Sequence, residues 1–282
     1  MFNAIGIIGL GLIGGSLGLA IKHNKLSKVV IGFDTNKENL NDALKLELID
    51  IGANSYKSFS ICDFVIVSVP PSQTAKVILD LFDVLRENTI IIDVASVKEP
   101  IIADIKSSIP KGISYIPTHP IAGTENFGPK SAFRQLFDDK YFIITPINEI
   151  TFAEKKVEEF AKKINMKVKY MDAKRHDEVF AYVSHLPHII AYNLVNLIWN
   201  KKENDEAYSF VGGGFKDFTR IAKSNEKMWS DIFFLNKKNV LSAINDYIEN
   251  LLVLKTIIEN NDKEKLLETL KNIRLFKEHL DG

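Results

Sequence analysis

A glycine-rich turn near the N-terminus constrains the fold of this chain more than any other feature. Gly9, Gly11 and Gly14 form the pattern G-x-G-x-x-G. Residues 5–8 before it read as a short buried strand, and the uncharged apolar stretch that continues to Ile21 reads as a helix. This order is typical of a dinucleotide-binding turn. Gly9 permits the tight turn, Gly11 lets the backbone approach a pyrophosphate, and Gly14 lets helix and strand pack closely.

An acidic residue at the end of the next predicted strand supports the same interpretation. Residues 29–33 read as that strand, and Asp34 ends it, 20 residues after Gly14. A carboxylate there can accept hydrogen bonds from the adenosine ribose, and it would repel a 2′-phosphate. We therefore predict NAD rather than NADP. The predicted cofactor-binding residues are Gly9, Gly11, Leu12, Ile13, Gly14, Asp34, Ser68, Val69 and Ser96.

The remaining pattern predicts two domains. Strands are expected at 64–69, 89–94, 141–145 and 167–171, and they alternate with helices at 39–48, 75–85, 100–108 and 152–164. This alternation predicts an α/β Rossmann-type, doubly wound, mostly parallel sheet in an N-terminal domain of residues 1–171.

The character of the sequence changes near Asp172. Only long helical patterns follow, at 177–199, 228–255 and 262–280. Their broad apolar faces must be buried against each other or against a partner chain. We therefore predict an all-α C-terminal domain of residues 172–282 that forms a homodimer.

Composition excludes several classes of partner and site. The chain has 36 basic and 36 acidic residues, so it shows no basic excess for nucleic acid. Residues 4–21 carry no charge, but no basic residue precedes them and their glycines disfavour a helix throughout, so neither a signal peptide nor a membrane span is predicted. Cys62 is the single cysteine and reads as a buried structural thiol. A cytoplasmic protein is expected.

The segment from Thr118 to Glu125 carries the best candidate for a catalytic base. His119 is followed by Pro120 and is expected on a short turn. Histidine titrates near physiological pH and can take a proton during catalysis, so a fixed histidine beside a hydride acceptor suggests a dehydrogenase acting on an alcohol. Ser96 follows the strand at 89–94 and can hydrogen-bond a nicotinamide or the histidine. Its alternative role is an N-cap for the helix near Pro100.

Two segments of the predicted helical domain carry further polar side chains. His185 and His188 are three residues apart and share a helical face. A metal site is an alternative to buried histidines there, but no acidic third ligand has the usual spacing, so no metal is predicted. After three glycines come Asp217 and Arg220, which can pair on one helical face. An arginine beside a glycine loop can also bind a carboxylate.

Together these segments resemble the prephenate dehydrogenase family, which includes arogenate dehydrogenase. The resemblance runs through nearly the whole chain. It is carried by the glycine turn, 93–98, 119–125, Leu136-Phe137, Thr145-Pro146, His176-Asp177, 184–188, 212–220 and Met228-Trp229.

The resemblance implies the oxidative decarboxylation of prephenate to 4-hydroxyphenylpyruvate, a precursor of tyrosine, with NAD as cofactor. It implies that His119 accepts the hydroxyl proton, Ser96 orients it, and Arg220 binds a substrate carboxylate. It further implies a substrate site and a gating network, in which Glu125, Asp177 and Asp217 steady the arginine. The substrate-binding residues implied are His119, Thr124, Glu125, His188, Asp217, Arg220 and Trp229.

Other functions fit parts of this pattern. Arogenate dehydrogenase differs only in the side chain of its substrate, and no residue decides between the two. A dehydrogenase of another hydroxy acid would share the first domain but would not need the segments around His119 and Arg220. A non-catalytic NAD-sensing protein would not need the histidine, serine and arginine together. A stand-alone dehydrogenase is expected, with any tyrosine feedback at or near the active site.

Overall fold

A computed structural model describes residues 1–200 and 209–281. Contacts divide the chain into two compact units, Met1–Lys237 and Lys238–Gly282. The first unit contains both sheets and every predicted site residue. Residues 201–208 of the predicted helical domain lie outside the described residues.

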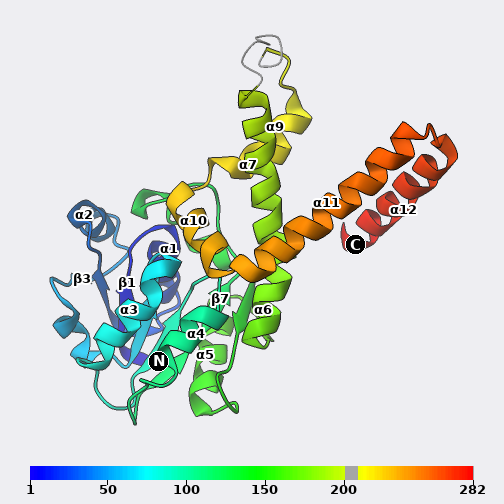
Figure 1. The fold of residues 1–282 in the computed structure, drawn as a ribbon. Helices are drawn as coiled ribbons and strands as arrows, with labels where there is room; N and C mark the ends of the chain where they lie inside the picture. Colours follow the sequence, from blue (N-terminus) through cyan, green and yellow to red (C-terminus); the bar gives the residue numbers. More distant parts are fainter. Residues whose placement is uncertain (201–208, 282) are drawn as a thin grey trace. The chain divides into compact units, whose positions relative to one another are not determined.

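The centre of the first unit is a six-stranded parallel sheet (Figure 1). Its strands are β1 (Phe2–Ile8), β2 (Ser27–Phe33), β3 (Ile51–Gly52), β4 (Phe64–Val67), β5 (Ile90–Asp93) and β6 (Ser114–Ile116). Their spatial order is β3-β2-β1-β4-β5-β6, so the direction of winding reverses between β1 and β4. Ligands of open α/β sheets bind at such a reversal, outside the carboxyl ends of the strands.

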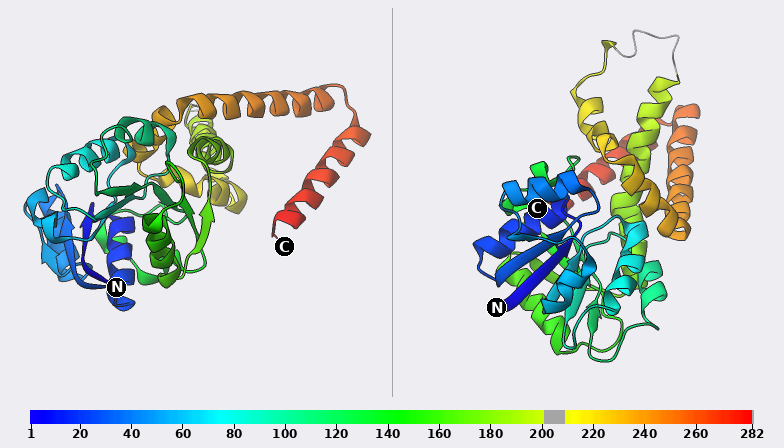
Figure 2. Two further views of the ribbon diagram at one scale, coloured as in Figure 1. Left: turned by 90° about the horizontal axis from the view of Figure 1, so that it is seen from below. Right: turned by 90° about the vertical axis from the view of Figure 1, so that its left-hand side faces the viewer.

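Helices cover both faces of this sheet, because its apolar side chains alternate between them (Figure 2). Ile5 and Ile7 face α1 (Leu12–His23) and α5 (Phe152–Lys163), and α2 (Lys37–Lys45) joins the same cluster through Ala43. Ile8 and Val67 face α3 (Pro71–Phe82) and α4 (Glu99–Ile105). The predicted doubly wound fold is therefore confirmed.

Cys62 lies in the second of these clusters and is completely buried. Burial, with a smaller effect of Asp63, raises the pKa of its thiol to about 12. A thiol that stays protonated is a poor nucleophile. The predicted structural role of Cys62 is therefore confirmed.

A second, three-stranded sheet carries the candidate base. Its strands are β7 (Thr118–Pro120), β8 (Tyr141–Ile144) and β9 (Lys167–Tyr170). His119 pairs with Ile143 across the antiparallel β7–β8 ladder. The prediction that His119 lies on a turn was wrong, because a three-residue strand is too short to show a period-two pattern.

The helices that follow remain within the first unit. They are α6 (Ala173–Phe180), α7 (Leu186–Trp199), α9 (Gly213–Thr219) and α10 (Glu226–Leu235). A π-helical turn, Ala181–His185, interrupts the helix predicted at 177–199. Pro187 follows this turn and has no backbone N–H to donate, which explains why regular α-helical bonding fails there. Such turns often occur at functional sites.

The second unit is a helical hairpin formed mainly by α11 (Lys237–Glu259) and α12 (Lys263–Asp281). The predicted helix 228–255 is divided at Asn236, which ends α10. Large apolar side chains are exposed along both helices of the hairpin: Leu251, Leu252, Val253, Ile258, Leu267, Leu270, Ile273 and Phe276. Exposed apolar surface of this extent is typical of an interaction face. Among the described helices, none is long and apolar enough to span a membrane.

Candidate active site

The glycine turn has the shape that a dinucleotide requires. Gly9 has φ +90°, and a Cβ there would lie 2.2 Å from the Ser68 carbonyl oxygen. A Cβ on Gly14 would lie 1.9 Å from the Gly9 oxygen. A Cβ on Gly11 would meet no atom within 4 Å, and Gly11 is the uncapped N-cap of α1. The turn therefore presents free helix N–H groups beside open space, which fits a pyrophosphate.

The two kinds of glycine are separable by mutation. Gly11→Ala should change the free energy of unfolding by less than about 1 kcal/mol, because nothing crowds the new methyl group. It should still weaken NAD+ binding about tenfold or more, because the methyl group stands where the pyrophosphate approaches. Gly14→Ala should instead destabilise the fold by about 1–3 kcal/mol or more, because its methyl group meets backbone.

Thermal unfolding and NAD+ titration of both variants measure this difference. Equal loss of stability in the two variants would remove the argument that Gly11 serves the ligand. Unchanged NAD+ affinity of Gly11→Ala would do the same.

Asp34 is bound to the glycine turn. Its Oδ2 accepts a hydrogen bond from the Leu10 backbone N–H at 2.9 Å, and its Oδ1 accepts one from Asn36 N–H at 2.8 Å. The carboxylate is half-buried at the carboxyl end of β2. Its position beside the turn is the one that a ribose-binding acid needs.

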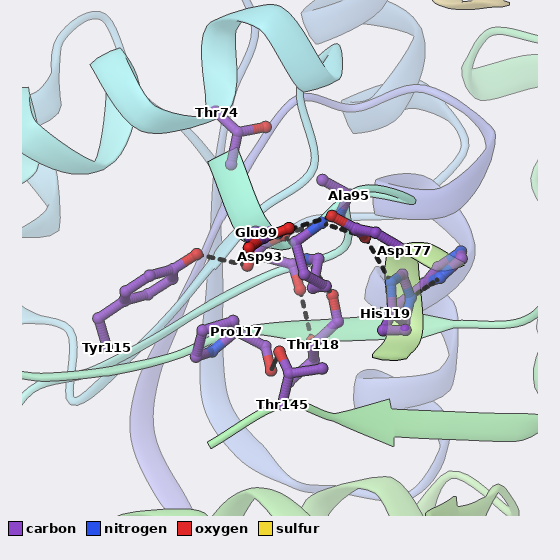
Figure 3. A network of polar contacts seen from close by, with 12 residues as sticks. Thr74, Asp93, Ala95, Glu99, Tyr115, Pro117, Thr118, His119, Thr145 and Asp177 are labelled. Carbon is purple, nitrogen blue, oxygen red and sulfur yellow. Dashed lines mark hydrogen bonds and ion pairs between the residues drawn. The ribbon is translucent and has the colours of Figure 1, made fainter. Parts of the chain in front are cut away.

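His119 is the outer member of a row of three hydrogen-bonded side chains. Its Nδ1 lies 2.8 Å from Nε2 of His176, and Nδ1 of His176 lies 2.8 Å from Oδ1 of Asp177. The Asp177 carboxylate also accepts the backbone N–H groups of Lys98 and Glu99, each at 2.8 Å. Asp177, which lies on α6, thus caps the start of α4. Through His176 it also links His119 to that helix (Figure 3).

A buried ion pair anchors the loop that carries Ser96. Asp93 and Lys98 flank this loop, are both fully buried, and form an ion pair. The Lys98 ammonium also donates to the Thr118 carbonyl at 2.6 Å, and the Tyr115 hydroxyl donates to Asp93 Oδ2 at 2.8 Å (Figure 3). The loop of Ser96 and the strand of His119 are therefore fixed to the same pair of charges.

The hydrogen bonds of Asp177 show which side chain caps α4. The alternative role of Ser96 as N-cap is wrong, because the N-cap position is Lys98 and the cap hydrogen bonds come from Asp177. The Ser96 side chain is half-buried. Its predicted role beside the cofactor and the histidine stays a prediction.

The electrostatic surroundings keep His119 neutral. Burial, with the neighbouring His176 and Lys98, holds the pKa of His119 well below its ordinary value. The ring packs against Phe180, with ring centres 4.9 Å apart. A neutral, immobilised imidazole is ready to accept a proton at neutral pH.

Aromatic side chains from the helices form a second part of the site. His188 stacks on Trp229 with ring centres 3.5 Å apart, and its Nδ1–H donates to the Ser184 carbonyl at 2.9 Å. Trp229 and His185 are buried, and in the described part of the chain neither Trp229 Nε1 nor His185 Nε2 has a hydrogen-bond partner. Buried polar atoms without partners are rare, so these two atoms are candidates for hydrogen bonds to a ligand.

Arg220 is paired across the chain with Glu125. Their Nη1 and Oε2 atoms are 2.6 Å apart, and the arginine side chain is 57% exposed. A hydrogen bond from its own backbone and the nearby Arg220 lower the pKa of Glu125. The predicted pair of Arg220 with Asp217 was wrong: within residues 1–200 and 209–281, Asp217 is exposed and forms no ion pair with it. Arg220 pairs instead with Glu125, one of the acids that the family resemblance implied.

The implied role of Asp177 beside the arginine was also wrong. Asp177 is 1% exposed and is bound to His176 and the start of α4. The sequence suggested no role for His176. Its position beside Asp177 on a helix does not indicate which strand the side chain will contact in the fold. Thr124 is exposed, and its hydroxyl accepts the Asn126 N–H at 3.2 Å.

Four partly or fully buried histidines predict acid lability of the fold. Burial is the largest cause that lowers the pKa of His119, His176, His185 and His188, and that of His185 falls to about 4. Below pH 6.5 the unfolded chain binds protons on these histidines that the folded chain does not bind, so the free energy of unfolding decreases as pH falls. Each such histidine contributes up to about 1.4 kcal/mol per pH unit in the range between its unfolded and its folded pKa.

Thermal unfolding measured between about pH 7 and pH 5 checks this expectation. The melting temperature should fall steadily below pH 6.5, and His176→Phe should show a shallower slope because it removes one of the four groups. A melting temperature that does not change over this range would contradict the account.

Comparison with known proteins agrees with this geometry. The family model described as the nucleotide-binding domain of prephenate dehydrogenase matches residues 17–170, which is more than half of the chain. The model of the prephenate dehydrogenase dimerization domain matches residues 172–272. This chain belongs to the prephenate dehydrogenase family. The predicted family, fold class and dehydrogenase class are confirmed.

Individual members of the family are similar over nearly the full chain. The cyclohexadienyl dehydrogenase of Zymomonas mobilis is 34% identical over 96% of this chain and 94% of its own length. The prephenate dehydrogenase of Bacillus subtilis is 32% identical over 99% of this chain and 76% of its own. The prephenate dehydrogenase of Aquifex aeolicus, solved with hydroxyphenyl propionate and NAD+, is 34% identical, covers 99% of both chains and superposes with a TM-score of 0.93.

Proposed function

We propose that this member of the prephenate dehydrogenase family oxidises prephenate to 4-hydroxyphenylpyruvate with NAD+ and releases CO2. The observation that supports the proposal is the neutral His119, which lies on β7 next to Thr118 and is held by its hydrogen bond to His176, which Asp177 holds in turn. NAD+, when bound at the glycine turn, supplies the hydride acceptor. The Aquifex aeolicus relative was solved with NAD+ and a hydroxyphenyl acid, which supports both the cofactor and the substrate class.

His119 performs the proton transfer of this reaction. As hydride leaves the ring carbon that bears the hydroxyl group, His119 takes the hydroxyl proton and prevents a high-energy cationic product. The bond between the ring and its carboxylate breaks, its electron pair enters the ring, and CO2 leaves. The ring becomes aromatic, and the proton held by His119 returns to the product oxygen. Prephenate and NAD+ thus give 4-hydroxyphenylpyruvate, CO2 and NADH without net proton uptake.

Arg220 provides the positive charge for the dianionic substrate. Its guanidinium is exposed, and in the part of the chain that the structure describes it is bound through Nη1 to Glu125, so it can turn to a substrate carboxylate in bidentate geometry. Glu125 holds the arginine at the site and gives way to the substrate. His188, Trp229 and Thr124 complete the substrate site in this proposal, while Ser96 orients the hydroxyl group and the nicotinamide.

Steady-state assays with prephenate and arogenate, each with NAD+ and NADP+, test this proposal. The expected result is NADH formation with prephenate, and a preference for NAD+ because the Asp34 carboxylate repels a 2′-phosphate. Turnover of arogenate alone would assign the chain to the other activity of its family. A preference for NADP+ would overturn the role of Asp34. Absence of turnover with either substrate would refute the proposed function.

We also propose that the chain acts as a homodimer through its helical domain. The match of residues 172–272 to a dimerization domain and the exposed apolar side chains of α11 and α12 support this assembly. We further propose a domain boundary near residue 171; the division between the two family models supports it, whereas contacts divide the chain after Lys237. Sedimentation of the purified protein measures the mass of the assembly directly.

A further inference from the structure

The row of side chains behind His119 has a function beyond holding the strand. We propose that Asp177 and His176 are positioning residues that fix the tautomer of His119, so that its Nε2 carries the free lone pair. This inference rests on the proposed function only in taking His119 as the base. The tautomer matters because a neutral imidazole has one N–H and one acceptor nitrogen, and only the acceptor can take the substrate proton.

Asp177 determines which nitrogen of His176 carries the proton. Both of its oxygens accept backbone N–H groups, from Lys98 at Oδ1 and from Glu99 at Oδ2. These backbone N–H groups can only donate hydrogen bonds, so the carboxylate oxygens must accept them. The Asp177 side chain is 1% exposed, so no bulk water competes for its oxygens. The nitrogen of His176 that lies 2.8 Å from Oδ1 must therefore be a donor, and His176 carries its proton on Nδ1.

His176 in turn determines which nitrogen of His119 carries the proton. Burial, the largest effect on His176, lowers its pKa, so the ring is neutral and its Nε2 is an acceptor. The atom that faces this acceptor at 2.8 Å is Nδ1 of His119, which must therefore donate. The neutral ring of His119 then has its lone pair on Nε2. With both rings neutral, no other assignment satisfies these contacts.

The same contacts fix the orientation of the base. Phe180 packs against both rings, with ring centres 4.9 Å from His119 and 4.5 Å from His176. A flip of His119 would break its bond to His176 and turn Nε2 away from the site. In histidine-dependent catalysis a wrong tautomer can cost about 10⁴-fold in kcat, which sets the upper limit for this effect.

Two substitutions of His176 separate hydrogen bonding from packing. His176→Phe keeps a buried aromatic ring but leaves the Nδ1–H of His119 without an acceptor. His176→Gln removes the ring but places an amide oxygen near the former Nε2. We expect kcat to fall roughly 10- to 10²-fold in the phenylalanine variant, with partial recovery in the glutamine variant and little change in either KM. His23→Gln, at the exposed end of α1, is the matched control and should match the wild type.

Nitrogen NMR of protein labelled in its histidine rings reads the tautomer without turnover. The wild type should show His119 protonated on Nδ1 only, and His176→Phe should show a mixture of both forms. A proton on Nε2 of His119 in the wild type would overturn the proposal. A kcat of His176→Phe equal to or above that of His176→Gln would overturn it as well. If the wild type oxidised neither substrate but kept the expected tautomer, the proposed function would fail and this assignment would stand.

Discussion

Replacing His119 by asparagine is expected to lower kcat by about 10²- to 10⁴-fold while leaving the fold and NAD+ binding intact. The asparagine amide reaches about as far as the ring Nδ1, so it can still donate to Nε2 of His176. What is lost is the second ring nitrogen, the only part of His119 that can take the substrate proton. Because the loss concerns the transition state, the KM for NAD+ should stay close to the wild-type value.

Single-turnover and steady-state rates measure the loss of kcat, and NAD+ titration by fluorescence measures whether cofactor binding is kept. The melting temperature of His119→Asn should remain within a few degrees of the wild type, since the asparagine amide can keep the hydrogen bond to His176. Turnover within a fewfold of the wild type would show that another group takes the proton. Loss of NAD+ binding together with turnover would instead point to a damaged fold.

Replacing Arg220 by glutamine is expected to raise the KM for prephenate about 10- to 10²-fold. A hydrogen bond to a charged partner contributes about 1.5–3 kcal/mol, and glutamine keeps the length of the side chain but not its charge. The arginine is exposed and lies on the short helical segment Arg220–Lys223, so the substitution should leave stability almost unchanged. The kcat should fall much less than kcat/KM.

Arg175→Gln is the matched control for this charge. Arg175 is also exposed, and among the described residues it is paired with Glu178 on the same helix, so its loss should leave the KM unchanged. The wild-type KM should rise with ionic strength, and that of Arg220→Gln should rise less, because salt screens an exposed charge. An unchanged KM in Arg220→Gln would remove the arginine from the substrate site.

The sequence was most informative where local geometry decides the outcome. The glycine turn and the acid after the second strand depend on spacing that a single chain segment contains, and the structure has both as predicted. The parallel sheet could be predicted because alternating strands and helices allow few other topologies.

The contacts behind His119 could not be predicted in the same way. His119 and His176 are 57 residues apart, and their hydrogen bond depends on how α6 packs beside β7. Spacing suggested only that Arg220 can pair with the acid three residues before it, and Glu125, which pairs with it from 95 residues away, was implied by the family resemblance alone. Side-chain partners across elements are set by tertiary packing, which spacing along one element does not record.

The most direct test of the proposed reaction is to measure NADH and CO2 from the same wild-type sample with prephenate labelled in its ring carboxylate. Oxidative decarboxylation predicts equal amounts of the two products throughout the reaction, with 4-hydroxyphenylpyruvate accumulating at the same rate. NADH formed without labelled CO2 would identify a simple alcohol dehydrogenase and contradict the account.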